Sequence, residues 1–156
     1  MKILSTFFLG LVLLTACKEG VVYSSEIKLT DASWSYGQKL NYTWDIQDTS
    51  LLYDIILTLN HRDDLKYHNL YTKIVSVYPD STKFENILSL ELFSPSGKPL
   101  GKCTGSNCTT PILLQEKVAF NKTGKYTIEL WQNSRDSVIQ NIGSIAIEIS
   151  KSQLSK

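Results

Sequence analysis

Leu40-Asn41-Tyr42-Thr43-Trp44-Asp45-Ile46 is the stretch of sequence that decides the fold, because apolar and polar residues alternate along it without a break. Successive side chains of a β-strand point to opposite faces, so this alternation predicts a strand over residues 40–46 with one buried face. Tyr42 and Trp44 fall in the apolar phase, and we therefore expect both of them in the core.

The same kind of pattern recurs along the rest of the chain. Further strands are predicted over residues 53–59, 70–78, 88–92, 112–120, 126–130 and 145–149. Turn-forming groups separate several of them, for example Ser94-Pro95-Ser96-Gly97 and Asn121-Lys122-Thr123-Gly124. Only residues 134–140 have helical character, and that segment is short. The sequence thus predicts an all-β domain, an antiparallel β-sandwich (jelly-roll-like) of about seven or eight strands.

The start of the chain has the order of a lipoprotein signal. Lys2 precedes an apolar run from Ile3 to Leu14, which is shorter than the roughly 20 residues that a membrane span needs. Leu14-Thr15-Ala16-Cys17 then has the form of a lipobox. A secretory signal with a coincidental cysteine is the alternative, but all four lipobox positions fit at the correct distance from Met1. We expect residues 1–16 to be a lipoprotein signal peptide and Cys17 to be the lipid attachment site.

Processing at this site would define the domain organisation. Removal of residues 1–16 would leave 140 of the 156 residues, enough for one compact domain with a core. We expect a lipidated cysteine and tether over 17–25, the β-sandwich over 26–151 and a C-terminal tail over 152–156. The composition of residues 18–25 fits either a tether or an early edge strand.

The charge of the mature chain narrows the classes of partner. One of the 16 basic residues, Lys2, lies in the signal segment, so 15 basic and 15 acidic side chains would remain. This balance argues against a nucleic-acid-binding protein and against attachment to a membrane by charge, because both need a basic excess. After Cys17, no apolar stretch approaches membrane-spanning length.

Two cysteines remain besides Cys17, and they are close in sequence. Cys103 and Cys108 are separated by four small or polar residues, which favours a local disulfide in an oxidising compartment. Such a short loop removes little chain entropy, so the bond would mainly rigidify a loop tip. Zinc ligation is the runner-up, but only His61 and His68 could complete the four ligands. We expect no metal and no cofactor.

Sequence motifs for catalysis are missing. His61 and His68 lie in a charged segment between two predicted strands, which we interpret as a solvated loop. Neither G-x-S-x-G nor H-E-x-x-H occurs, and no serine is placed as a partner for either histidine. The sequence therefore predicts a protein that is not an enzyme.

Aromatic residues offer an alternative function. Trp34, Tyr36, Trp44 and Trp131 could form a platform for stacking sugars on one face of a sandwich. Trp131 is out of phase with its apolar neighbours and is expected on the outer face, where it needs partial cover. Core or interface packing is the preferred interpretation of these side chains, with glycan binding as the alternative.

Two blocks of sequence carry a resemblance to a known family. They are Arg62…Tyr67-His68-Asn69-Leu70 and Phe120…Gly124-Lys125-Tyr126…Gln132…Arg135…Ile142-Gly143…Ile147-Glu148. With the lipobox, Trp34 and Asp48-Thr49…Tyr53-Asp54-Ile55, they make the chain similar to the gliding-motility lipoprotein family GldH of the Bacteroidota. The order and spacing of these motifs carry the match, which runs from Trp34 to Ile149.

The resemblance implies a cell-envelope lipoprotein that supports gliding and the associated type IX secretion machinery, with secretion as the broader role. It implies no catalytic residues. Matching motif positions are Arg62, Tyr67, Asn69, Gln132 and Arg135. These side chains would either satisfy buried backbone groups or contact a partner, and the sequence leaves both roles open. The two later cysteines are not part of the family pattern.

The sequence as a whole leads to one functional hypothesis. We expect a non-enzymatic accessory of the gliding motility and type IX secretion machinery, anchored to the membrane by its N-terminal lipid and docking protein partners. Lys18 follows the lipidated cysteine, where an Asp would favour retention at the inner membrane, so we expect the periplasmic face of the outer membrane. The alternative is a surface lipoprotein that binds glycans through exposed aromatic side chains.

Overall fold

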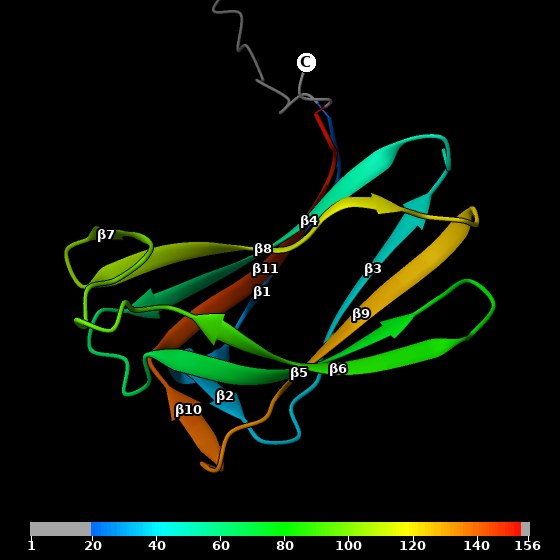
Figure 1. Ribbon diagram of the computed structural model, residues 1–156. Helices are drawn as coiled ribbons and strands as arrows, with labels where there is room; N and C mark the ends of the chain where they lie inside the picture. Colours follow the sequence, from blue (N-terminus) through cyan, green and yellow to red (C-terminus); the bar gives the residue numbers. More distant parts are fainter. Residues whose placement is uncertain (1–19, 154–156) are drawn as a thin grey trace, which may run out of the picture.

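The computed structural model describes residues 20–153, which form an all-β domain without an α-helix in that range (Figure 1). The elements are β1 (Val21–Lys28), the 3-10 turn η1 (Thr30–Ala32), β2 (Ser33–Ser35), β3 (Leu40–Ile46), β4 (Leu52–Arg62), β5 (Asn69–Val77), β6 (Lys83–Glu91), β7 (Lys102–Thr104), β8 (Asn107–Ala119), β9 (Gly124–Gln132), β10 (Val138–Gln140) and β11 (Ile142–Lys151). No helix within residues 20–153 is long and apolar enough to cross a membrane.

The strands form two large sheets and one small one, with antiparallel pairing throughout. The first sheet has the order β1-β11-β4-β8-β7, the second β3-β9-β5-β6, and β10 pairs with β2. There are eight long strands, which in chain order are β1, β3, β4, β5, β6, β8, β9 and β11. Numbered from one to eight, they have the order 1-8-3-6 in the first sheet and 2-7-4-5 in the second. This is the strand order of a jelly roll. The predicted antiparallel sandwich is thus confirmed, and strands β2, β7 and β10 are too short for periodicity to reveal.

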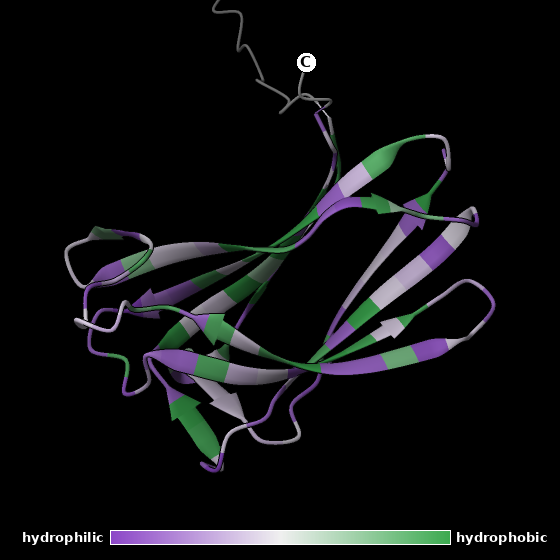
Figure 2. Cartoon of the chain, viewed as in Figure 1, coloured by the Kyte–Doolittle hydropathy of each residue, from purple (hydrophilic) through white to green (hydrophobic). Residues whose placement is uncertain are grey.

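The inner faces of the two large sheets form the core, as the alternation predicted. Figure 2 shows hydrophobic and hydrophilic residues following one another along the strands. Tyr42 and Trp44 on β3 are both buried. The hydroxyl of Tyr42 donates a hydrogen bond of 2.7 Å to the carbonyl oxygen of Ile145, which joins the two sheets through the core. Burial raises the pKa of Tyr42 well above its ordinary value, with smaller contributions from Tyr23 and Glu26, so the hydroxyl remains a donor.

The start of the sandwich requires a correction. The expected boundary between residues 25 and 26 is too late, because β1 begins at Val21 and pairs with β11 from Ser150 to Ser144. Its inward positions include Ser25, and this polar residue interrupts the apolar alternation that would have revealed the strand. The predicted signal peptide over residues 1–16, Cys17 and the end of the tail lie outside the described residues.

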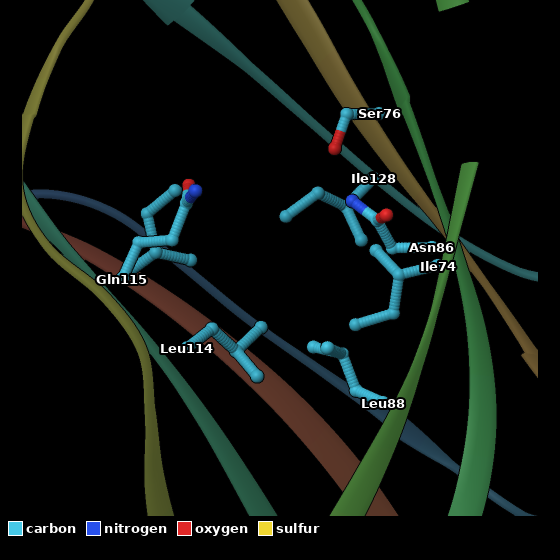
Figure 3. Close-up of a pocket in the computed structure, with 8 residues that line it drawn as sticks. Ile74, Ser76, Asn86, Leu88, Leu114, Gln115 and Ile128 are labelled. Carbon is cyan, nitrogen blue, oxygen red and sulfur yellow. The ribbon is translucent and has the colours of Figure 1, made fainter. Parts of the chain in front are cut away.

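The sandwich is open along the side where β6 and β8 face each other (Figure 3). A cavity of about 130 Å³ lies between the two strands. Figure 3 shows Ile74 and Leu88 on one side of this cavity and Leu114 on the other. The two sheets therefore do not cover each other completely at this edge.

Candidate functional site

Two loops meet at one end of the sandwich. They are residues 63–68, between β4 and β5, and residues 133–137, between β9 and β10. Asp136 accepts hydrogen bonds on Oδ2 from the hydroxyl of Tyr67 and from Nζ of Lys66, the latter at 2.9 Å. The bond from Tyr67, followed by that from Lys66, lowers the pKa of Asp136, and the bond to Asp136 raises the pKa of Lys66. An ionised carboxylate thus joins the two loops.

Gln132 determines the shape of the second loop from below. It is buried at the end of β9, and its Nε2 donates to the carbonyl oxygen of Asp136 at 2.9 Å. Its Oε1 accepts from the backbone N–H of Ser134 at 2.9 Å and from the hydroxyl of Ser134 at 2.7 Å. Gln132 therefore satisfies polar groups of a tight loop in place of regular strand pairing.

Arg135 stands at the top of this loop between two exposed tyrosines. A depression of about 500 Å³ is lined by Tyr71 and Arg135, and a second of about 410 Å³ by Tyr36 and Arg135. Tyr36 is 66% exposed and Tyr71 is 53% exposed. Within residues 20–153, the guanidinium of Arg135 makes no hydrogen bond or ion pair. We call Tyr36, Tyr71 and Arg135 the tyrosine–arginine surface.

Four of the five motif residues predicted from the sequence meet here. Tyr67, Asn69 and Arg135 line the larger depression, and Gln132 lies beneath it. Asn69 uses its Nδ2 to donate to the hydroxyl of Ser89 at 2.6 Å, which ties β5 to β6. The sequence did not point to Asp136, whose importance depends on a contact with a residue 69 positions earlier.

The fifth motif residue, Arg62, lies apart from this surface. It ends β4, and its Nε is 3.4 Å from Oδ1 of Asp64. Its backbone N–H donates to the carbonyl oxygen of Asn141 at 3.0 Å. The position of Arg62 is thus one of local strand and loop contacts, and it does not line either depression.

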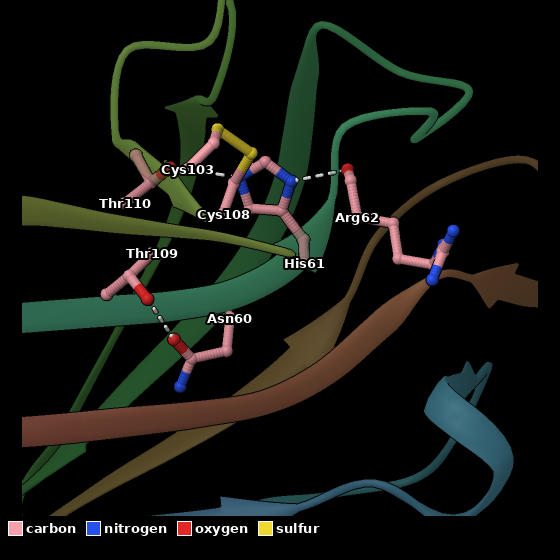
Figure 4. Close-up of a disulfide and its surroundings, with 7 residues drawn as sticks. All are labelled: Asn60, His61, Arg62, Cys103, Cys108, Thr109 and Thr110. Atoms are coloured by element: carbon pink, nitrogen blue, oxygen red, sulfur yellow. Dashed lines mark hydrogen bonds between the residues drawn. A yellow bond between two sulfur atoms is a disulfide. The ribbon is translucent and has the colours of Figure 1, made fainter. Parts of the chain in front are cut away.

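The prediction that His61 lies in a solvated loop is wrong, because β4 continues through Arg62. His61 is 3% exposed and packs against Phe93, with 5.4 Å between the ring centroids. Its Nδ1 donates to the carbonyl oxygen of Arg62 at 2.8 Å, and its Nε2 is 2.9 Å from Oγ1 of Thr110 (Figure 4). The Nε2 contact therefore joins β4 to β8, whereas the Nδ1 bond is local to the end of β4. His68 also contacts the ring of Phe93, at 5.6 Å between centroids, but its side chain is exposed.

Cys103 and Cys108 are joined by a disulfide beside His61 (Figure 4). The two residues are directly opposite each other in the β7–β8 hairpin, with their Cα atoms 4.0 Å apart. Gly105 has a φ of +57° at the first of the two turn positions, a conformation that glycine adopts without strain. Within the described part of the chain, no group of three or more His, Cys, Asp or Glu side chains could hold a metal ion.

None of the three tryptophans forms an exposed platform. Trp34 and Trp44 are buried. Trp131 lies on the outer face of its sheet, as predicted, where the Nζ atoms of Lys39 and Lys73 are 5.8 and 5.1 Å from its ring centroid. The two lysine side chains supply the partial cover that an outward tryptophan needs.

A known protein family matches nearly all of the described part of the chain. The model of the family described as GldH lipoprotein matches residues 21–149, from β1 to β11, and so includes both loops of the site. A protein of Christiangramia forsetii, named gliding motility lipoprotein GldH homolog, is 23% identical over 129 residues. That alignment covers 83% of this chain and 78% of the relative.

Proposed function

Because this chain belongs to the GldH lipoprotein family, we propose that it is a lipid-anchored accessory of the gliding motility and type IX secretion machinery that works by docking a protein partner. The relative from Christiangramia forsetii, whose name refers to gliding motility, supports the motility part of this proposal. The proposed role needs no catalysis, and the anchor would be Cys17 in the lipobox Leu14–Cys17.

The docking proposal rests on the position of Arg135, which is exposed between Tyr36 and Tyr71. Arginine and tyrosine are the residue types, with tryptophan, that most often dominate the binding energy of protein interfaces. Arg135 has no hydrogen-bond or ion-pair partner for its guanidinium within residues 20–153 and could pair with a partner's carboxylate, while Tyr36 and Tyr71 offer apolar area beside it. The bonds from Gln132 and Tyr67 hold the loop in place, so little conformational entropy would be lost on binding.

The buried position of His61 supports a non-enzymatic role. A histidine that acts as a general base needs one ring nitrogen within reach of a substrate or nucleophile. Both nitrogens of His61 are engaged in contacts with Arg62 and Thr110, and the ring is buried. The described residues also offer no group of metal-binding side chains.

Lipid anchoring would place the tyrosine–arginine surface close to membrane-bound partners. Acyl chains on Cys17 would hold the protein at the membrane, and a tethered domain meets its partner at a high effective concentration. We propose the periplasmic face of the outer membrane as the location, on the basis of Lys18 after the lipidated cysteine. Protease treatment of intact cells tests this, since efficient digestion of the domain would mean that it faces outward.

Glycan binding is the second candidate, and it rests on the exposed rings of Tyr36 and Tyr71. The three tryptophans, which are the strongest stacking residues, are buried or covered by lysines. Docking of a protein is therefore the better-supported function of this surface.

Charge reversal at Arg135 tests the docking proposal. The native gene is replaced by one encoding Arg135→Glu, and type IX cargo in the medium is measured, together with gliding where the organism glides. Lys125→Glu is the matched control. Lys125 is also an exposed cation, but it lies near the start of β9, whereas Arg135 lies in the loop that follows the end of β9. We expect the Arg135 variant to impair secretion while the control secretes normally.

The role in this machinery and the docking at this surface can be refuted separately. Normal secretion and gliding after deletion of the whole gene would refute the role in this machinery. A normal phenotype of the combined variant Tyr71→Ala with Arg135→Glu, in a cell that needs the gene, would refute docking at this surface. Melting temperature and membrane fractionation of each variant show whether it is folded and anchored.

A further inference from the structure

Strand β6 is an open edge of the sandwich. It is the last strand of the sheet β3-β9-β5-β6, and within the described residues it pairs only with β5. Eight of its nine residues are exposed, because the cavity beside β8 leaves even its inward side uncovered. It contains no proline or glycine, and its pairing with β5 has no register shift. A long, regular and partly apolar edge of this kind is a template for pairing with another strand.

The edge strand on the other side of the opening is protected differently. The start of β8 is covered by β7, and its later part is irregular. Register shifts interrupt its pairing with β4, and Lys117 has a φ of +54°. Bulges and twists of this kind prevent pairing with further strands, so of the two strands that border this opening, β6 is the one available for pairing.

We propose that β6 pairs with β6 of a second copy of this chain, antiparallel and around a two-fold axis at Ile87. In that register, Lys83 of each copy lies opposite Glu91 of the other, and Ile87 lies opposite itself. Neither Lys83 nor Glu91 makes an ion pair within residues 20–153, and Ile87 is 58% exposed. Opposite charges in directly paired positions stabilise a sheet, and here they occur at both ends.

The sequence of β6 selects this register over its neighbours. An axis at Leu88 would place Glu85 opposite the second copy's Glu91, and like charges in paired positions are destabilising. An axis at Asn86 would place Lys83 opposite the second copy's Ser89 and Glu85 opposite its Ile87, so no charges would be matched. On the inward side, the axis at Ile87 brings Phe84, which is 56% exposed, opposite the second copy's Leu90.

Pairing at β6 would merge the two four-stranded sheets into one continuous sheet of eight strands. The buried area of a strand pair is small, but two copies confined to one membrane meet at a high effective concentration. This part of the inference rests on the proposed lipid anchor. Tyr71 lies on the neighbouring strand β5, so a dimer would carry the Tyr71 side chains of both copies on one continuous sheet.

Cysteine cross-linking of the full lipoprotein in its own envelope tests the pairing. In the variant Ile87→Cys, the new thiols of two copies would face each other, and mild oxidation should give a covalent dimer on non-reducing gels. Lys125→Cys is the control, because it lies on the outer face of the same sheet but on β9, away from the edge. We expect a dimer from the first variant and none from the second.

Charge exchange in the Ile87→Cys background tests the register. Lys83→Glu alone, or Glu91→Lys alone, turns two attractive pairs into two repulsive ones, and we expect a roughly tenfold loss of dimer. Both substitutions together restore opposite charges at both ends and should restore the dimer. Unchanged melting temperatures are expected for all of these variants, since Lys83 and Glu91 have no ion-pair partner to lose within the described part of the chain.

Three results would overturn the inference. They are the absence of a dimer from Ile87→Cys, equal cross-linking of the two cysteine variants, and single charge variants that cross-link as well as their parent. A cross-linked band of another mass would show that a different protein occupies β6, which also contradicts pairing between copies. None of these readouts uses secretion, so the dimer and the docking function can fail independently.

Discussion

The hydroxyl of Tyr67 donates a hydrogen bond to Oδ2 of Asp136, and this contact joins two loops that are 69 residues apart in the sequence. Lys66 donates to the same oxygen from the same loop as Tyr67. Because Arg135 directly precedes Asp136, the ionised carboxylate also keeps the arginine at the top of its loop. The geometry of the tyrosine–arginine surface therefore depends on the charge of Asp136.

We expect Tyr67→Phe to raise the pKa of Asp136 toward its ordinary value of about 3.9. The bond from Tyr67 is the largest cause of the lowered pKa and that from Lys66 the second, so Lys66→Gln should raise it less. Carbon NMR of the side-chain carboxyl group during an acid titration measures both shifts. A larger effect of Lys66→Gln would contradict this order of causes.

The same contact predicts how the loop responds to acid. The folded-state pKa of Asp136 is lowered, so its stabilising effect is fully present above the unfolded value near 3.9 and is lost as the pH falls through the lower folded value. The protection of the amides of residues 134–136 from hydrogen exchange, relative to the intrinsic rate at each pH, should therefore stay high at pH 5 and fall at strongly acidic pH. In Tyr67→Phe we expect this fall in protection to begin at a higher pH. Identical pH profiles for the two proteins would rule out the link.

His61→Ala should lower the free energy of unfolding by about 2 to 4 kcal/mol. The substitution leaves a hole beside Phe93 and removes the partner of the buried Thr110 hydroxyl. His68→Ala is the control, with an expected change within about 0.5 kcal/mol because His68 is exposed. Urea denaturation measures both. Equal stability of the two variants would contradict the structural role of His61.

Removal of the disulfide should have a modest effect. Cys103 and Cys108 are five residues apart, and closing so short a loop contributes about 2 kcal/mol in the chain-entropy model. We expect the variant Cys103→Ser with Cys108→Ser to fold and to lose at most this amount, measured by denaturant unfolding. Wild-type protein treated with a reductant should show the same loss. Free thiols at both positions in protein taken from the envelope would show that the bond is absent in the cell.

Cys17→Ser should block lipidation and leave an uncleaved or mislocalised precursor. The sulfur atom of Cys17 would carry the diacylglyceryl group. Cleavage of the chain before Cys17 would follow the attachment of that group. Mass spectrometry of the wild-type mature protein provides the measurement, with acyl chains expected on an N-terminal cysteine. An unmodified N-terminus would refute the proposed anchor.

The strands that periodicity predicted best are those with a covered face and an open face. Residues 40–46 were predicted as a strand, and β3 has these bounds, because each inward residue is apolar and each outward one polar. Residues 88–92 were predicted as a strand, but β6 begins at Lys83. Its first inward positions face the open side of the sandwich, where burial does not require apolar residues. In β1, the inward residue Ser25 is polar, and it interrupts the apolar alternation by which the strand would have been predicted.

The candidate site was predictable only in part. The family-like blocks pointed to Tyr67, Asn69, Gln132 and Arg135, and the structure places all four around one loop. Their different roles did not follow from the blocks. The buried Gln132 holds the loop from below, whereas Arg135 is exposed at its top.

By itself, the sequence determined the fold class and the inward-facing side of the strand at 40–46, because a strand's period of two residues is a local property of the chain. The order of residues in the lipobox is local in the same way. Only the tertiary structure decided that His61 is buried, that Tyr67 meets Asp136 and that β6 is left uncovered. Each of these depends on which distant strands and loops become neighbours, and burial and hydrogen bonding then act on residues that the sequence alone does not bring together.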